Sequence, residues 1–237
     1  MLLHGVGLDH TMWEPAAAQL AGRFDVTALD LPGHGGREPA RDGITLAEMA
    51  DDVAARLAPA THIAGFSLGA LVAQHIARHR PELVASLISV SSVCQRTPAE
   101  RAAVLERLET AAADFPASVA ASLHRWFPDS GDTELAAATE ATLLANDVRS
   151  YLNCYRVFAT ADADIAPELG AVTAPSLAVT GELDPGSTPE MTRRLAAAIP
   201  HSTAVVVPQA RHMLPVEKPQ EFAAALTTFI EGTFNDE

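Results

Sequence analysis

The chain contains 237 residues, of which 48% are apolar and 19% are charged. This composition is typical of one globular unit with a buried core and not of a disordered chain. The formal net charge is −14, from 30 acidic and 16 basic side chains, which argues against a nucleic-acid surface and against attraction to an acidic membrane.

The N-terminus and the two cysteines bear on the cellular compartment. Met1 to Gly5 contains no basic stretch, and its apolar run stops after two leucines, so no signal peptide is expected. No segment approaches the roughly 18 apolar residues of a membrane-spanning helix. Cys94 and Cys154 are too few for a disulfide framework and lie outside metal-ligand spacings. We therefore expect a cytoplasmic protein with reduced, buried thiols and no bound metal.

The first part of the chain alternates short apolar runs with helical patterns. One strand is expected from Met1 onward and another at residues 25–29. Apolar residues recur at helical spacing from 46 to 57. Thr45 is the expected N-cap, because Glu48 follows three residues later as a capping-box partner.

The alternation continues with a strand at 62–65, a helix at 68–79 and a strand at 83–90. The last of these is almost continuously apolar, as expected when helices cover both faces of a parallel sheet. Strands that alternate with helices imply right-handed βαβ units. The sequence thus predicts an α/β fold with a mostly parallel sheet of about six strands.

The pattern changes after Cys94. Residues from about 97 to 165 are helical throughout, with breaks expected at Pro116, at 128–131 and around Asp147. The alternation then resumes with strands at 176–180 and 203–207 and with helices at 189–199 and 216–230. The predicted organisation is a core of residues 1–94 and 169–237, into which a helical cap of residues 95–168 is inserted.

Gly65-Phe66-Ser67-Leu68-Gly69 matches the pattern G-x-S-x-G between a predicted strand and a predicted helix, which is the context that this motif requires. A nucleophilic serine there occupies a tight, strained turn, so both flanking positions need residues without a Cβ. The following helix places the positive end of its dipole beneath a developing oxyanion. The motif predicts Ser67 as a nucleophile.

A serine nucleophile needs a base, and the base needs a carboxylate that orients it. His212 follows the predicted strand at 203–207, at the carboxyl end of the sheet, where sites form in open α/β folds. The loop after the preceding strand supplies Glu182 and Asp184. We favour Asp184, because a turn at Gly181 would direct it toward the histidine, and keep Glu182 as the alternative.

An oxyanion hole needs two backbone N–H groups. Leu68, directly after the nucleophile, is expected to supply one of them. The loop His4-Gly5-Val6-Gly7 after the first strand supplies the other, with Val6 as the donor. This loop lacks the third glycine and the downstream acidic residue of a dinucleotide fingerprint, so no Rossmann-type cofactor is expected.

Together these residues resemble the α/β-hydrolase superfamily over essentially the whole chain. The matching segments appear in family order at 4–7, 12–15, 30–35, 65–69, 181–185 and 211–212. Within the superfamily the chain looks most like the 3-oxoadipate enol-lactonase group and its carboxylesterase relatives. The reasons are Met12-Trp13, Arg125-Trp126-Phe127 in the cap, and the length of the cap. Members carry two strands ahead of the one ending in His-Gly. Here these are missing, so either the natural chain begins earlier or the sheet is two strands shorter.

The resemblance implies a serine hydrolase that cleaves an ester or lactone of a small carboxylic acid through an acyl-enzyme, without metal or organic cofactor. It also implies that the cap is a lid over the pocket. A general carboxylesterase, an amidase, a carbon–carbon bond hydrolase and a cofactor-free perhydrolase would use the same triad. A ligand-binding member with little turnover belongs to another class, which a fluorophosphonate probe would separate.

Two expectations concern partners. A carboxylate-bearing lactone needs a local cation in a chain of net charge −14, and Arg125 beside Trp126 is the predicted contact because guanidinium pairs with carboxylate in a bidentate manner. Trp13 is predicted to contact the same substrate. The strand at 25–30 is expected at an exposed sheet edge, which favours a homodimer.

Overall fold

A computed structural model describes residues 1–128 and 133–234. Its centre is one six-stranded sheet in the order β2-β1-β3-β4-β5-β6, and every neighbouring pair is parallel. This confirms the predicted α/β fold. The strands are β1 (Leu2–Leu3), β2 (Ala28–Leu29), β3 (Thr61–Phe66), β4 (Val84–Val90), β5 (Ser176–Gly181) and β6 (Ser202–Val207).

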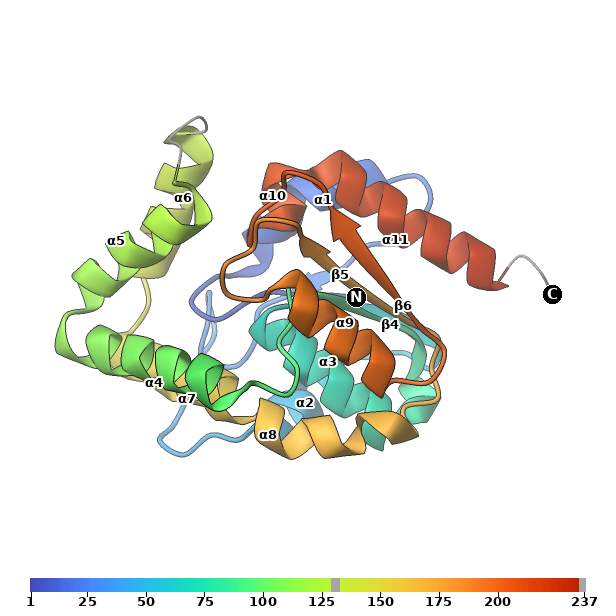
Figure 1. The fold of residues 1–237 in the computed structure, drawn as a ribbon, viewed down its shortest axis with the longest axis horizontal. Helices are drawn as coiled ribbons and strands as arrows, with labels where there is room; N and C mark the ends of the chain where they lie inside the picture. Colours follow the sequence, from blue (N-terminus) through green and yellow to red (C-terminus); the bar gives the residue numbers. More distant parts are fainter. Residues whose placement is uncertain (129–132, 235–237) are drawn as a thin grey trace.

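Helices cover both faces of the sheet (Figure 1). One face carries α1 (Glu14–Leu20), α10 (Leu214–Glu217) and α11 (Pro219–Phe234), and the other carries α2 (Leu46–Ala54), α3 (Leu68–His79) and α9 (Pro189–Ala198). Short 3-10 helices are η1 (His10–Trp13), η2 (Pro81–Leu83) and η3 (Ala166–Ala171). The central strand β4 is buried at six of its seven positions, because helices exclude water from both of its sides.

The cap between β4 and β5 is helical, with α4 (Pro98–Ala113), α5 (Phe115–Trp126), α6 (Thr133–Leu144), α7 (Val148–Thr160) and α8 (Asp162–Ile165). The helices α5 and α6 project from the rest of the molecule (Figure 1). Asp147 caps α7 by accepting a bond from the Ser150 N–H, so the break expected there is confirmed. The break expected at Pro116 falls at Asp114, which caps α5 and leaves Pro116 in the first turn. Of the break expected at 128–131, residues 129–131 lie outside the described ones.

Two predicted elements differ from the structure for physical reasons. The strand expected at 25–29 pairs only at Ala28 and Leu29, because its partner β1 is itself two residues long. The helix expected at 216–230 is two helices, since Pro219 cannot continue α10 and instead begins α11. The strand β2 lies at the sheet edge as expected, and the dimer that this edge favours stays a prediction.

Other sequence predictions agree with the structure. Thr45 and Glu48 form the predicted capping box at the start of α2. Cys94 and Cys154 are buried free thiols, and burial raises their pKa values to about 11 and about 12. Within residues 1–128 and 133–234, no helix has the length and apolar character needed to cross a membrane.

Candidate active site

Ser67 occupies the tight turn between β3 and α3. Its φ of 53° and ψ of −109° lie in the left-handed half of conformational space, which non-glycine residues rarely occupy. A Cβ on Gly65 would lie 2.1 Å from the carbonyl oxygen of Gly69, and a Cβ on Gly69 would lie 2.4 Å from that of Leu3. Both flanking positions therefore require glycine, as the motif predicted.

The turn presents Ser67 at the N-terminus of α3. Leu68 is the first residue of this helix, and no side chain caps the helix end. The first backbone N–H groups of a helix have no acceptor within it. Leu68 N–H is therefore available to an oxyanion that forms beside Ser67.

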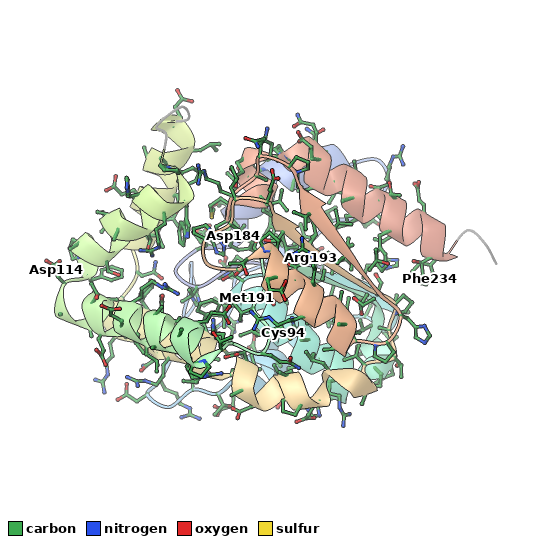
Figure 2. The ribbon with its side chains drawn as sticks, viewed as in Figure 1. Cys94, Asp114, Asp184, Met191, Arg193 and Phe234 are labelled. Atoms are coloured by element: carbon green, nitrogen blue, oxygen red, sulfur yellow. The ribbon has the colours of Figure 1, made fainter. Side chains whose placement is uncertain are left out.

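Asp184 and His212 meet across the loops that follow β5 and β6. His212 Nδ1 lies 2.8 Å from Asp184 Oδ2, and both side chains are buried. The other carboxylate oxygen accepts bonds of 2.8 Å from the backbone N–H groups of Gly186 and Ser187. Because an ionised carboxylate only accepts, Nδ1 carries the imidazole proton and Nε2 is left as the basic nitrogen. Figure 2 shows Asp184 beside the N-terminal end of α9.

The alternative carboxylate does not reach the histidine. Glu182 Oε2 accepts bonds from the backbone and side chain of Gln209, at 3.0 and 3.4 Å, and its side chain is exposed. A Cβ on Gly181 would lie 2.3 Å from the carbonyl oxygen of Ala210. Glycine at that position lets the loop carrying His212 pass close to the loop carrying Asp184.

Ser91 is a further contact of the His212 loop that the sequence did not identify. It lies just beyond β4 with a φ of 44° and is fully buried. Its hydroxyl donates a 3.1 Å bond to the backbone carbonyl of His212. On the other side, the His212 ring contacts Phe66 at 5.0 Å and stacks on Trp126 at 5.4 Å between centroids.

Ser67, His212 and Val6 line one pocket together with Arg125 and Trp126 of α5. The structure therefore brings these predicted residues to one place. Trp13 is a correction, since it is not among the described residues of this pocket. It is fully buried in the core, where its ring packs against Phe66 and Phe222.

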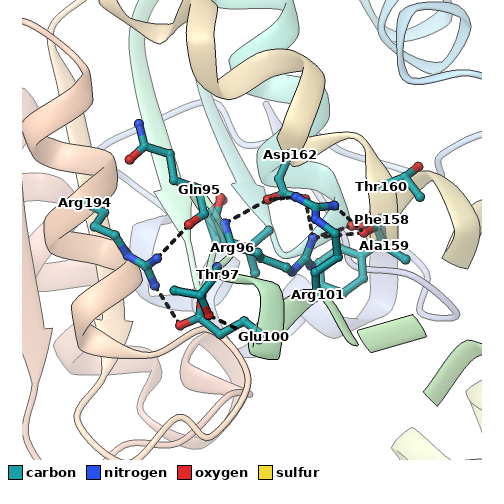
Figure 3. Close-up of polar contacts among 12 residues, drawn as sticks. Gln95, Arg96, Thr97, Glu100, Arg101, Phe158, Ala159, Thr160, Asp162 and Arg194 are labelled. Carbon is teal, nitrogen blue, oxygen red and sulfur yellow. Dashed lines mark hydrogen bonds and ion pairs between the residues drawn. The ribbon is translucent and has the colours of Figure 1, made fainter. Parts of the chain in front are cut away.

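The pocket carries a surplus of positive charge. Arg96, Arg107 and Arg125 line it, whereas no acidic side chain is among its described lining residues. The nearby carboxylate of Asp162 is already bound by Arg96 at 2.7 Å and by Arg101 at 3.2 Å (Figure 3).

Arg107 and Arg125 have no carboxylate partner within the part of the chain that the structure describes. Arg125 donates a 2.8 Å bond to the hydroxyl of Ser122. Burial, followed by the charge of Arg107, lowers the pKa of the Arg125 guanidinium. Arg96 and Arg107 were not predicted, because nothing in their local sequence shows that the cap turns them toward Ser67.

The loop after β1 lies directly against Ser67. A Cβ on Gly5 would lie 3.3 Å from the Ser67 Cβ. His4 is fully buried, and its Nδ1–H donates to the Gly5 carbonyl at 2.7 Å while its Nε2 accepts from Leu31 N–H at 2.9 Å. Burial lowers the pKa of His4 to about 4, so this imidazole is neutral and keeps both bonds at neutral pH.

Known proteins resemble this chain over nearly its full length. A model of the alpha/beta hydrolase family matches residues 1–225. The (E)-2-((N-methylformamido)methylene)succinate hydrolase of Acinetobacter baylyi is 31% identical over 98% of this chain and 90% of that protein. The 3-oxoadipate enol-lactonase 1 of the same organism is 27% identical over 97% and 87%. The malate-bound esterase of Thermogutta terrifontis has a TM-score of 0.84 and 26% identity, over 98% of this chain and 88% of that one.

Proposed function

Because the chain belongs to the alpha/beta hydrolase family, we propose that it is a serine hydrolase that cleaves an ester or lactone bond of a small carboxylic acid. The family that the motifs predicted is confirmed. The similar proteins include a hydrolase, an enol-lactonase and an esterase. The identity of the substrate and the roles of the individual residues are the content of this proposal.

In the proposed reaction Ser67 Oγ attacks the carbonyl carbon while His212 Nε2 takes the hydroxyl proton. Asp184 holds the imidazole in the required tautomer through the 2.8 Å bond to Nδ1 and stabilises the imidazolium that forms. The N–H groups of Leu68 and Val6 bind the oxyanion. His212 then protonates the leaving oxygen, and a water molecule activated by the same histidine hydrolyses the acyl-enzyme. This sequence of steps needs no metal ion or cofactor.

The surplus cations in the pocket support a substrate that carries a free carboxylate. Arg107 and Arg125 line the same pocket as Ser67 and His212. A partly desolvated guanidinium without a carboxylate partner is costly in the free protein, and binding an anion reduces that cost. The names of three similar proteins agree with this interpretation, since they mention a succinate derivative, 3-oxoadipate and bound malate.

A panel of small esters and lactones, with and without a free carboxylate, tests the proposal on the purified protein. We expect turnover of the carboxylate-bearing members and covalent labelling of Ser67 by a fluorophosphonate probe. Ser67→Ala should abolish both labelling and turnover, by several orders of magnitude for turnover. Labelling without turnover of any ester or lactone would indicate another acyl substrate, and turnover that survives in Ser67→Ala would refute the nucleophile.

A further inference from the structure

The cap contacts the loop after β1 at Gly7. This residue has a φ of +75°, and a Cβ on it would lie 2.6 Å from the Tyr151 ring and 2.8 Å from a methyl of Leu143. The side chain of Asn146 donates a 2.8 Å bond from Nδ2 to the Gly7 carbonyl. Gly7 is therefore enclosed by residues from α6, from α7 and from the corner between them.

The bond from Asn146 is the first link of a chain that ends at Val6 N–H. The Gly7 carbonyl belongs to the same planar peptide group as Leu8 N–H. Leu8 N–H in turn donates to the Gly5 carbonyl at 3.2 Å, and that carbonyl shares its peptide group with Val6 N–H. Two peptide groups in series thus connect the amide of Asn146 with the donor assigned to the oxyanion hole.

The four residues from Gly5 to Leu8 form a β-turn that explains why this chain of bonds is well defined. Val6 and Gly7 are the central residues, and the positive φ of Gly7 is the conformation that a type II turn requires at its third position. The Gly5 carbonyl accepts a second bond, from His4 Nδ1. The Gly5–Val6 peptide is therefore held from the core by His4 and from the cap side through Leu8.

Asn146 also holds the end of α6. The same Nδ2 atom lies 3.0 Å from the Thr142 carbonyl and 2.9 Å from the Leu143 carbonyl, both in the last turn of the helix, where the Leu143 carbonyl also accepts a 3.3 Å bond from the Asn146 backbone N–H. The helix α6 packs on α5, which carries Arg125 and Trp126. A displacement of α5 and α6 would therefore shift the acceptors that Asn146 contacts.

We infer that Asn146 is a positioning residue for the oxyanion hole, because it fixes the direction of Val6 N–H through the Gly7–Leu8 and Gly5–Val6 peptides. Hydrogen bonds in series polarise one another, so the bond from Asn146 also strengthens Val6 N–H as a donor. The inference rests on the proposed function, since it requires that Ser67 forms an oxyanion beside Val6. It assigns the cap a part in the chemical step in addition to substrate binding.

Asn146→Ala tests this inference, and Asn153→Ala is the matched control. Asn153 lies on α7, is equally half-buried, and donates from Nδ2 to the Ala40 carbonyl at 3.0 Å and to Asp42 at 3.1 Å. Both variants remove one amide that ties the cap to a core loop, but only Asn146 contacts the loop after β1. The measurements are kcat and KM for 4-nitrophenyl acetate, the rate of fluorophosphonate labelling, and the melting temperature.

We expect Asn146→Ala to lower kcat and the labelling rate about tenfold with KM changed less than twofold, while Asn153→Ala changes all three less than twofold. Asn146→Leu keeps roughly the volume of the side chain, carries no donor and places no charge beside the carbonyl oxygens of Gly7, Thr142 and Leu143, so it should reproduce the loss and serves where Asn146→Ala does not fold. Equal behaviour of the Asn146 and Asn153 variants would overturn the inference and leave the hydrolase intact. A wild-type protein that the probe does not label would overturn the proposed function and the inference with it.

Discussion

Arg125→Ala should weaken the binding of a carboxylate-bearing ester and spare a neutral one. Hydrogen bonds to charged groups contribute about 1.5–3 kcal/mol when they are shielded from water, which corresponds to a rise in KM of about 10–150-fold. Exposed ion pairs contribute about 0.2–1 kcal/mol, or less than about sixfold. Arg125 is part-buried, lines the pocket and has its pKa lowered by burial, so the structure favours the larger range.

The same change should cost the free protein little stability. Arg125 gives up one bond to the neutral Ser122 hydroxyl and is relieved of repulsion from Arg107. We expect the free energy of unfolding to change by less than about 1 kcal/mol. Replacing Arg96 should cost much more stability, because its side chain and that of Asp162 are both buried. Breaking a buried ion pair lowers the free energy of unfolding by about 3–5 kcal/mol.

The assay compares the 4-nitrophenyl half-ester of adipic acid with 4-nitrophenyl acetate, because both release the same leaving group. Arg149→Ala is the control, since Arg149 is a cap arginine paired with Asp42 at the surface and is not among the described residues of the pocket. Arg125→Ala should raise KM at least tenfold for the half-ester only. Equal effects on both esters, or none on either, would refute carboxylate binding by Arg125 and leave a general esterase.

Two other predictions concern the base and the loop after β1. Asp184→Asn should lower kcat by roughly 10³–10⁴-fold, because the histidine loses its tautomer and orientation. Glu182→Gln should leave kcat within twofold, since Glu182 binds Gln209. A large loss in Glu182→Gln and a small one in Asp184→Asn would show that the carboxylates are misassigned. The pKa of His4 falls to about 4 on folding. As the pH drops below about 6.5, His4 is therefore protonated in the unfolded chain while it stays neutral in the folded one. The free energy of unfolding, measured in urea, should therefore decline from pH 6.5 to pH 4, by about 2–3 kcal/mol at pH 4.5 from this group. His4→Gln should reduce the decline by about this amount, while His34, whose pKa burial lowers to about 3, keeps the remainder, and an unchanged slope would contradict a neutral buried His4.

The sheet and the nucleophile turn were predictable because their signals are local. Gly65 and Gly69 are needed by contacts within a few ångströms of Ser67, and strand, motif and helix follow one another without interruption. Asp184 was separable from Glu182 for a similar reason, since the turn at Gly181 lies three residues before it and Asp184 N–H bonds to the Gly181 carbonyl at 3.2 Å.

What the sequence did not predict depends on how distant segments pack. Arg107 was not predicted because it belongs to a different cap helix from the predicted Arg125, and only the packing of α4 on α5 brings both to the pocket that Ser67 lines. Trp13 was misassigned because a tryptophan beside the loop after β1 has the same sequence signal whether it faces the pocket or the core. In the structure the apolar contacts with Phe66 and Phe222 hold it in the core.

The two proposals together give the cap two functions that substitutions can separate. In the proposed function Arg125 binds the substrate carboxylate in ground state and transition state alike, so its loss should appear in KM. In the further inference Asn146 positions Val6 N–H, which binds an oxyanion that forms only after Ser67 attacks, so the loss of Asn146 should appear in kcat. Both belong to segments joined by the packing of α5 on α6. A cap displaced by a poorly fitting substrate would then weaken binding and the oxyanion hole together, which gives the protein a physical basis for selecting substrates by rate as well as by affinity.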